Sequence, residues 1–287
     1  MDLTEHKQSL YRNKYFYLLT LIFFSVSSIS QEKNIVIKSA GSFDRNQSLY
    51  PDGNILNESA NKKVHLTHDN MDIFSKKSIF FQKRNSFIAT GNVHVKQGDS
   101  INLFCDSLNY DGLTRKFSSY GSVKFINDEM ELNSNVLFFD RNANEIYFNK
   151  NGKIIDSVST IKSKEGKYFI DEKKYEFKEN VIVENPDYKI RSNMMDYFLN
   201  SEITLFYKFS TIMTDDYTIF CNEGFYDPQK KIGVFKKDAK VNSESRTIFG
   251  DSIFFDENKK YASASRNLKI IDEKENFIIK GEYAEVF

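Results

Sequence analysis

Few residues in this chain have side chains suited to redox chemistry or metal binding. Cys105 and Cys221 are the only two cysteines, so a disulfide is the first chemistry to weigh. His65, His68 and His94 lie close together in the sequence, but no further His, Cys or carboxylate stands beside them at the spacing of a metal site. We therefore expect His65 and His94 at exposed strand positions and predict no bound metal.

A carboxylate recurs along the chain, each time directly after an aromatic residue. Its members are Asp111, Asp140, Asp227 and Asp256. Calcium prefers such oxygens, but Asp followed by Gly, Pro or Asn is also the usual start of a tight turn, which explains the column without an ion. The sequence contains no Gly-x-Ser-x-Gly, no phosphate-binding glycine loop and no His-Glu-x-x-His. We therefore predict that the protein is not an enzyme and uses no cofactor.

The elements that position these residues repeat with a step of 29 residues. One column of the repeat is aromatic at every step: Phe81, Tyr110, Phe139, Tyr168, Tyr197, Tyr226 and Phe255. A second column is large and apolar: Phe74, Leu103, Leu132, Ile161, Ile190, Ile219 and Ile248. A third column, two residues after the second, is small at all but its first position: Lys76, Cys105, Ser134, Ser163, Ser192, Cys221 and Gly250. This regularity predicts equivalent units stacked around one shared interior.

Each unit is predicted to be a bent two-strand hairpin. Apolar residues recur at every second position, as in Leu103 and Cys105, which indicates a strand. The alternation resumes at Leu108 and Tyr110 in the opposite parity, so a bulge or corner must lie near Asp106–Ser107. We predict an all-β fold of roughly fourteen to sixteen strands. It is an elongated, solenoid-like β-jellyroll in which units of about 29 residues form two facing antiparallel sheets.

This stack argues against a disulfide. Cys105 and Cys221 occupy the same column four units apart. At about 4.8 Å per strand they would be separated by roughly 19 Å or more. A disulfide needs Cα atoms within about 7 Å of each other. We expect two free, buried thiols that serve as small core residues.

The N-terminal part of the chain differs from the repeats. Basic residues precede an apolar run over 15–26, which ends in Ser28-x-Ser30, the pattern of a cleavable signal peptide over residues 1–30. An uncleaved N-terminal anchor is the alternative. Residues 31–60 are predicted to be a linker with a first strand near Ile35–Ile37. Residues 61–287 are predicted to be the repeat domain, about eight units of which the last is incomplete. Lys+Arg and Asp+Glu each number 40, so no net charge favours nucleic acid.

The stretch Gly91-Asn-Val-His-Val-Lys-Gln-Gly-Asp-Ser-Ile-Asn-Leu-Phe-Cys-Asp-Ser-Leu-Asn-Tyr-Asp-Gly112 resembles the repeat of the OstA-like/LptA family, most of all the OstA-like proteins of the Bacteroidetes type. Gly121-Ser-Val123 restarts the motif, and Gly250-Asp-Ser-Ile-Phe-Phe-Asp256 matches its second half. The resemblance covers most of 61–287 and is weakest over 151–182, where Gly166 replaces the expected leucine.

The resemblance implies a jellyroll, in the periplasm or associated with the outer membrane, that binds the lipid A acyl chains of lipopolysaccharide and supports outer-membrane assembly. Implied partners are lipopolysaccharide, other transport jellyrolls paired edge to edge, and further copies of the chain arranged head to tail. The candidate lipid-facing residues are Leu103, Tyr110, Leu132, Phe139, Ile161, Tyr168, Ile190, Tyr197, Ile219, Tyr226, Ile248 and Phe255.

A second hypothesis is an exported structural or adhesive β-solenoid in which the same columns form a closed, dry core. The small residues Ser134, Ser163, Ser192, Gly166, Gly224 and Gly250 would leave gaps for a guest chain, which favours the lipid-binding interpretation.

Overall fold

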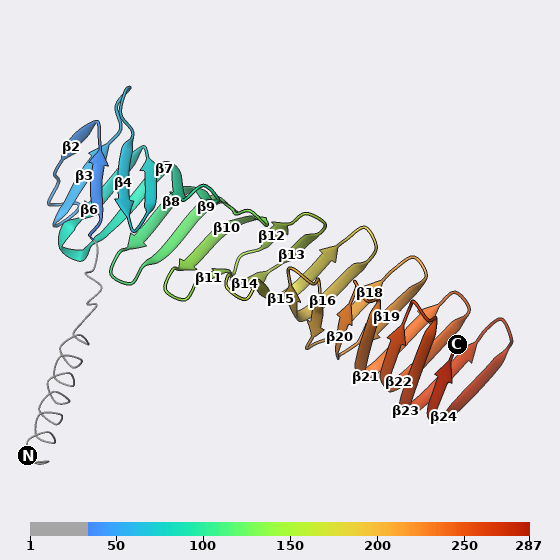
Figure 1. Cartoon of the computed structure of the whole chain (residues 1–287). Helices are drawn as coiled ribbons and strands as arrows, with labels where there is room; N and C mark the ends of the chain where they lie inside the picture. The colour runs from blue at the N-terminus through green and yellow to red at the C-terminus, as the bar shows by residue number, and fades with distance from the viewer. Residues whose placement is uncertain (1–33) are drawn as a thin grey trace, which may run out of the picture. The chain divides into compact units, whose positions relative to one another are not determined.

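The computed structural model describes residues 34–287, which form one unit of antiparallel β-structure (Figure 1). The predicted signal peptide lies outside the described residues. The N-terminal elements are β1 (Val36–Ser39), β2 (Ser42–Asp44), β3 (Gly53–Asn57), β4 (Val64–His68), β5 (Met71–Ser75), β6 (Lys77–Phe81) and the 3-10 helix η1 (Gln82–Arg84). The central strands are β7 (Ser86–Gln97), β8 (Ile101–Asp111), β9 (Lys116–Ile126), β10 (Glu131–Asp140), β11 (Glu145–Phe148), β12 (Gly152–Ile155), β13 (Thr160–Ser163), β14 (Glu165–Phe169), β15 (Lys174–Glu184) and β16 (Lys189–Phe198). The C-terminal strands are β17 (Thr204–Phe206), β18 (Ser210–Met213), β19 (Tyr217–Cys221), β20 (Glu223–Asp227), β21 (Ile232–Ser243), β22 (Arg246–Asp256), β23 (Tyr261–Asp272) and β24 (Phe277–Val286).

Every long strand bends near its middle, as the parity change in the sequence predicted. In β8 the register with β9 shifts between Phe104 and Ser107. In other places the bend separates two short strands, such as β11 and β12. Hydrogen-bonded pairing connects all 24 strands into one sheet. The number of strands exceeds the prediction because the two halves of an interrupted strand are counted separately. One antiparallel sheet is thus folded over itself into two facing layers, and the predicted all-β jellyroll is confirmed.

Five of these bends contain two consecutive residues with left-handed backbone. They are Gly91–Asn92, Gly121–Ser122, Glu179–Asn180, Lys237–Asp238 and Arg266–Asn267. Glycine adopts positive φ without steric cost, and φ is 77° at Gly91 and 73° at Gly121. The glycines of the Gly-Asn-Val and Gly-Ser-Val motifs therefore stand where the strand turns from one layer into the other.

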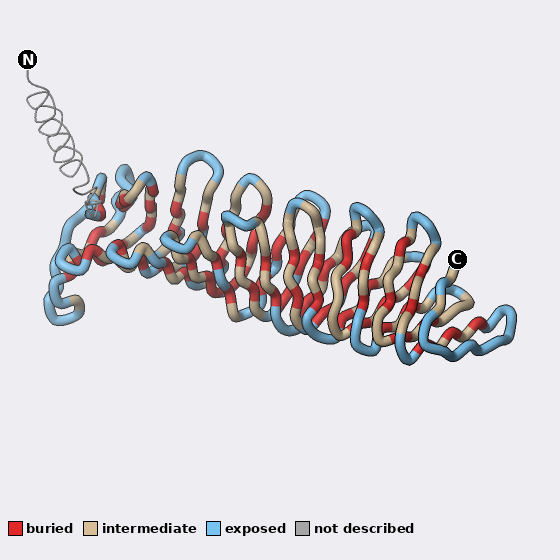
Figure 2. Tube along the Cα trace, turned by 60° about the horizontal axis from the view of Figure 1, so that its bottom comes forward, coloured by how far each residue is buried: buried red, intermediate tan, exposed pale blue. Residues whose placement is uncertain are grey.

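The predicted columns form the interior. All twelve candidate lipid-facing residues lie in or against one hydrophobic core; Phe255 alone is half-buried and the other eleven are buried. Aromatic rings stack along it, with centroid distances of 4.5 Å between Tyr110 and Phe117 and 4.4 Å between Tyr168 and Tyr175. In Figure 2 buried residues alternate with less buried ones along the strands, and exposed residues concentrate in the turns.

The first repeat unit is one residue out of step with the prediction. The residues in the three columns are Ile73, Ser75 and Phe80, in place of Phe74, Lys76 and Phe81. Ile73 pairs with Val95, which lies opposite Leu103. The prediction failed here because neighbouring positions in this unit are both apolar, so the alternation did not distinguish them. Phe74 instead lies half-buried on the outer face, stacked on His65 at 4.4 Å.

Residues 34–60 are also more ordered than the predicted linker. The expected first strand is present as β1, but β2 and β3 follow it, and β3 pairs with β6. The repeat unit therefore extends N-terminal to residue 61. These strands were missed because they are only three to five residues long, too short to show a clear alternation. Within residues 34–287 no helix is long and apolar enough to span a bilayer.

Candidate functional site

The turns at the two ends of the strands form two rows, which we call the acidic lip and the basic lip. The acidic lip comprises the turns 69–70, 98–100, 127–130, 156–159, 185–188, 214–216, 244–245 and 273–276. The basic lip comprises the turns 82–85, 112–115, 141–144, 170–173, 199–203, 228–231 and 257–260. The bends lie at mid-strand, so they join the two layers on the side away from the lips. The line along which the lips meet is called the seam.

The two lips differ sharply in charge. The acidic side chains of the acidic lip are Asp69, Asp99, Asp128, Glu129, Asp156, Asp187, Asp215, Asp216, Glu244, Glu273 and Glu275, against one cation, Lys274. The cations of the basic lip are Lys83, Arg84, Arg115, Arg141, Lys173, Lys230, Lys231, Lys259 and Lys260, against Asp171, Glu172, Glu202 and Glu257. A chain with no net charge therefore carries a strong charge separation across the seam.

At the N-terminal part of the seam, two arginines of the basic lip reach Asp69 of the acidic lip. Arg115 Nη2 lies 2.8 Å from Asp69 Oδ2. Arg141 Nη2 donates to the Asp69 carbonyl oxygen at 3.2 Å, and its side chain is only 6% exposed. Beneath them the Tyr110 hydroxyl lies 2.7 Å from His68 Nδ1 and accepts a hydrogen bond from Arg141 Nη1 at 3.5 Å. These contacts close the seam above the first aromatic-column tyrosine.

In the middle of the seam, Glu129 of the acidic lip forms an ion pair with Lys173 of the basic lip. The Tyr168 hydroxyl donates to the same carboxylate at 3.4 Å. Burial and then the charge of Glu129 raise the pKa of Tyr168 to about 12, so this hydroxyl stays protonated and remains a donor. A second aromatic-column residue thus holds its ring in the core and its hydroxyl at the seam.

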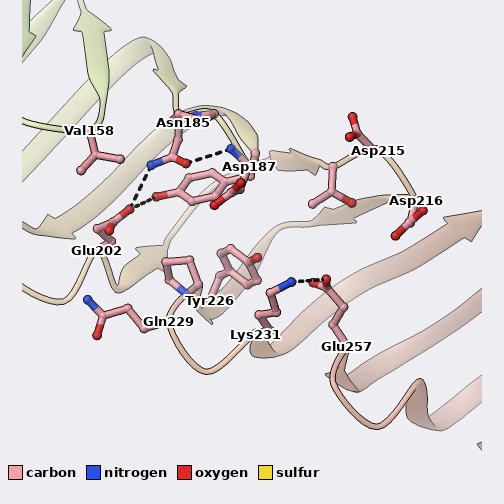
Figure 3. A pocket seen from close by; sticks show the side chains of 14 residues that line it. Val158, Asn185, Asp187, Glu202, Asp215, Asp216, Tyr226, Gln229, Lys231 and Glu257 are labelled. Carbon is pink, nitrogen blue, oxygen red and sulfur yellow. Dashed lines mark hydrogen bonds and ion pairs between the residues drawn. The ribbon is translucent and has the colours of Figure 1, made fainter.

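Further along, polar contacts involving carboxylates of the basic lip bridge the seam (Figure 3). Glu202 accepts hydrogen bonds from Asn185 Nδ2 at 3.1 Å and from the Tyr188 hydroxyl at 2.8 Å. Glu257 accepts one from the Tyr217 hydroxyl at 2.6 Å and pairs with Lys231 of its own lip at 2.8 Å. Burial opposes ionisation of Glu257, but the hydrogen bonds from Lys231 and Tyr217 bring its pKa below the ordinary 4.5.

Between these contacts the seam contains open space. A cavity of about 400 Å³ is lined by both lips, with Asp187 and Asp215 on one side and Lys231 and Glu257 on the other (Figure 3). A second cavity of about 390 Å³ lies between Asp156 and Glu202 and reaches Tyr197 of the aromatic column. The seam is therefore bridged at intervals and hollow between the bridges.

The interior beneath the seam is packed, and the predicted gaps at Gly166, Ser134 and Ser192 are occupied. A side chain on Gly166 would overlap the Phe148 ring, so that aromatic already fills the space. Ser134 Oγ lies 3.0 Å from the carbonyl oxygens of Val136 and of Asn151 and donates its one proton to either of them, and Ser192 Oγ donates to the carbonyl oxygen of Met194 at 3.1 Å. The serines of the small column lie at the bends, where the register shift leaves backbone groups without a partner on the neighbouring strand. Their hydroxyls provide hydrogen bonds to these backbone groups.

The other reactive residues identified in the sequence lie away from the seam or contribute polar contacts. Both thiols are buried and free, and burial raises the pKa of Cys105 and of Cys221 to about 12. His65 and His94 lie half-buried on the outer face, where His94 stacks on Phe104 at 4.3 Å. His68 is only 3% exposed, because it faces inward to the Tyr110 hydroxyl.

The carboxylate column serves its turns as predicted. Asp111 Oδ1 accepts hydrogen bonds from the amides of Leu113 and Thr114 at 2.9 and 3.1 Å. Asp140 does the same one unit later. Among residues 34–287, no group of three or more His, Cys, Asp or Glu side chains is arranged to hold a metal ion.

The family model described as OstA-like protein matches residues 32–193, more than half of the 287-residue chain. The chain belongs to the OstA-like family. The matched segment includes both Gly-x-Val bends and seven of the twelve interior column residues, from Leu103 to Ile190. The OstA-like repeat is therefore the bent strand pair seen here, and the glycine of its Gly-x-Val motif is the left-handed bend residue at Gly91 and Gly121.

Other comparisons add less. Solved structures similar to this OstA-like protein include LptH, described as the LptA homologous periplasmic component of the conserved lipopolysaccharide transport device from Pseudomonas aeruginosa. The match has 15% identity and a TM-score of 0.36, and it covers 45% of this chain and 94% of LptH. The comparison with curated proteins gave no match.

Sequence reasoning identified the interior but missed the residues of the seam, among them Asp69, Arg115, Glu129 and Lys173. One signal was available. Turns that follow the aromatic column are mostly basic and the alternate turns are acidic, a pattern visible in the sequence once the bend is placed.

Proposed function

We propose that this OstA-like protein is a periplasmic module for lipopolysaccharide transport whose apolar interior receives the acyl chains of lipid A. The observation that carries the proposal is the continuous core of the column residues lying beneath a seam that polar side chains bridge at intervals. Family membership and the signal-like N-terminus support a role in the envelope.

The energetics favour an acyl-chain ligand. Each methylene group transferred from water into an apolar interior contributes about 0.8 kcal/mol, so several acyl chains outweigh the few polar contacts that hold the seam. Equivalent side chains recur every unit, so a chain that leaves one unit meets a similar surface in the next. Because the interior is filled, the two layers must part at the seam while the bends act as the hinge.

The route also requires neighbours, and we propose that strand edges supply them. Strand β24 is hydrogen-bonded to β23 along one side. Ile278 and Ile279 on it are 61% and 46% exposed, and Tyr283 is 59% exposed. Another jellyroll module or a second copy that paired with this edge would extend the interior and cover the exposed residues.

Photocrosslinking in the native envelope tests the function. A photoreactive amino acid replaces Tyr197, which lies in the core and borders the seam, and in a matched variant replaces Tyr147, which is 38% exposed on the outer face. We expect lipopolysaccharide adducts from position 197 and none from position 147. Folded, exported protein without adducts at 197 would contradict the proposal.

The second candidate function is a structural or adhesive solenoid with a permanently closed core. The filled interior favours it, since Phe148 and the bend serines occupy the expected gaps. The same crosslinking experiment separates the two, because a permanently closed core gives no lipid adduct at position 197.

A further inference from the structure

We propose that the basic lip binds the anionic head group of the cargo and that the acidic lip occupies the same cations while the interior is empty. The inference rests on the proposed function and deepens it. The ligand class is an amphiphile that carries apolar chains and a phosphate-bearing head. The acidic lip then acts as an internal competitor, which a phosphate displaces when the seam opens.

The pair of Arg115 and Asp69 shows how such an exchange would work. Their atoms are 2.8 Å apart, and the side chains are 39% and 18% exposed, so solvent and solutes reach the pair. Arg115 Nε is buried and has no hydrogen-bonding partner in the described part of the chain. A phosphate offers more oxygens than a carboxylate and binds a guanidinium through two donors at once. It would therefore satisfy both Nε and Nη2 where Asp69 reaches only one.

The pair of Lys173 and Glu129 offers the second exchange point. Both side chains are partly exposed, 41% for the lysine and 31% for the glutamate. Ion pairs with this exposure are weak, equivalent to roughly two- to fivefold in an equilibrium constant. An acyl-chain ligand that gains apolar contacts below the seam can readily open such a pair.

The two parts of the ligand would bind next to each other. Tyr168 contributes its ring to the core and its hydroxyl to Glu129, so a head group at Lys173 would stand directly above the aromatic column. The cavities of about 390 and 400 Å³ further along the seam leave room for the bulk of a head group between the bridges.

Neutralising one member of the pair at a time tests this inference. The variants are Glu129→Gln and Lys173→Gln, with Lys153→Gln on the exposed outer side of β12 as the control. Each is titrated by calorimetry with dodecyl phosphate and with dodecyl maltoside, both below their critical micelle concentrations. Thermal unfolding of each variant verifies that it is folded.

We expect opposite effects on dodecyl phosphate. Glu129→Gln removes the competitor and tightens binding about two- to fivefold, whereas Lys173→Gln removes the phosphate partner and weakens binding by a similar factor. For the neutral maltoside, both variants break the same ion pair and shift binding in the same direction. Lys153→Gln leaves both affinities as in the wild type.

Other outcomes would overturn the inference. If both variants tighten dodecyl phosphate binding equally, the ion pair only holds the seam closed, and the basic lip binds no head group. If neither variant changes the affinity, the pair plays no part in binding. If neither amphiphile binds to the wild type, it is the proposed function itself that fails.

Discussion

The tyrosines of the aromatic column have two roles at once. Tyr110 stacks its ring on Phe117 in the core, while its hydroxyl meets His68 and Arg141 at the seam. Burial raises the pKa of Tyr110, so the hydroxyl is neutral at physiological pH. The column positions that hold Phe139 and Phe255 lack this hydroxyl. Aromatic identity alone therefore predicted burial but not which positions contact the lips.

A single glycine at a bend should be more sensitive than a glycine in a turn. Gly121 and Gly98 both have positive φ, 73° and 62°. A methyl group on Gly121 would overlap the Asp106 carboxylate, whereas one on Gly98 would meet no atom within 4 Å. We predict that Gly121→Ala destabilises by about 2 kcal/mol or more and Gly98→Ala by about 1 kcal/mol. Urea unfolding measures both; equal losses would show that Asp106 moves away without cost.

The bend is the element that defines the fold. It re-aims each strand, so that residues of opposite parity on its two sides share one interior. Two of the five double left-handed bends begin with glycine, and the others begin with Glu179, Lys237 and Arg266. Side chains in left-handed backbone cost roughly 1–2 kcal/mol each. The repeat thus tolerates local strain because pairing on both sides fixes the bend.

Relieving that strain should stabilise the stack. Arg266 has φ 60° and an exposed side chain. We predict that Arg266→Gly raises stability by about 0.5–1 kcal/mol, because the gain from a relaxed backbone exceeds the added entropy of the unfolded chain. Arg266→Ala is the control, since it removes the same side chain but keeps the strained backbone, and it should bring no gain. Thermal unfolding compares the three proteins; a lower midpoint for the glycine variant would contradict the prediction.

At the scale of the whole molecule, charge is balanced in number but separated in space. Lys+Arg and Asp+Glu are equal at 40 each, yet acidic and basic turns lie in different rows. Opposite charges on facing lips attract, which holds the empty seam together. Like charges within one lip repel each other, and this repulsion limits how closely the turns of neighbouring units approach.

The seam should weaken at acid pH. Glu257 faces Lys231, Tyr217 and Tyr226, and Asp215 and Asp216 lie across the cavity. Its pKa is lower in the folded protein than the ordinary 4.5, so its contribution to stability is complete above about pH 4.5 and is lost as pH falls through the folded-state value. We predict that the urea midpoint falls between pH 6 and pH 3.5, and that Glu257→Gln reduces this fall. An unchanged pH dependence in the variant would contradict the assignment.

The exposed edge of β24 should drive association between copies. We predict that the wild-type protein shows a sedimentation coefficient that rises with concentration and that Ile279→Lys abolishes the rise, because a charge at the edge disfavours strand pairing. Phe209→Lys is the control, since Phe209 is 53% exposed but lies between β17 and β18, away from the edge strand. A wild-type protein that sediments identically at all concentrations would refute edge pairing.

The sequence by itself determined the repeat, the bend near Asp106–Ser107 and the inward face of the twelve column residues. It could do so because a strand pattern has a period of two and a bend reverses its parity, so both are recorded in the order of apolar residues. The same logic failed in the first unit, where Ile73 and Phe74 are both apolar and either one fits the column.

Only the tertiary structure decided which turns face each other and how full the interior is. Asp69 and Arg115, or Glu129 and Lys173, are 44 to 46 residues apart, and their contact depends on how far the two layers fold toward each other at the bends. The filling of the space at Gly166 by Phe148 likewise depends on the distance between neighbouring strands and on ring orientation. Residue order encodes which face a side chain takes, whereas distances across the interior are set by packing of all units together.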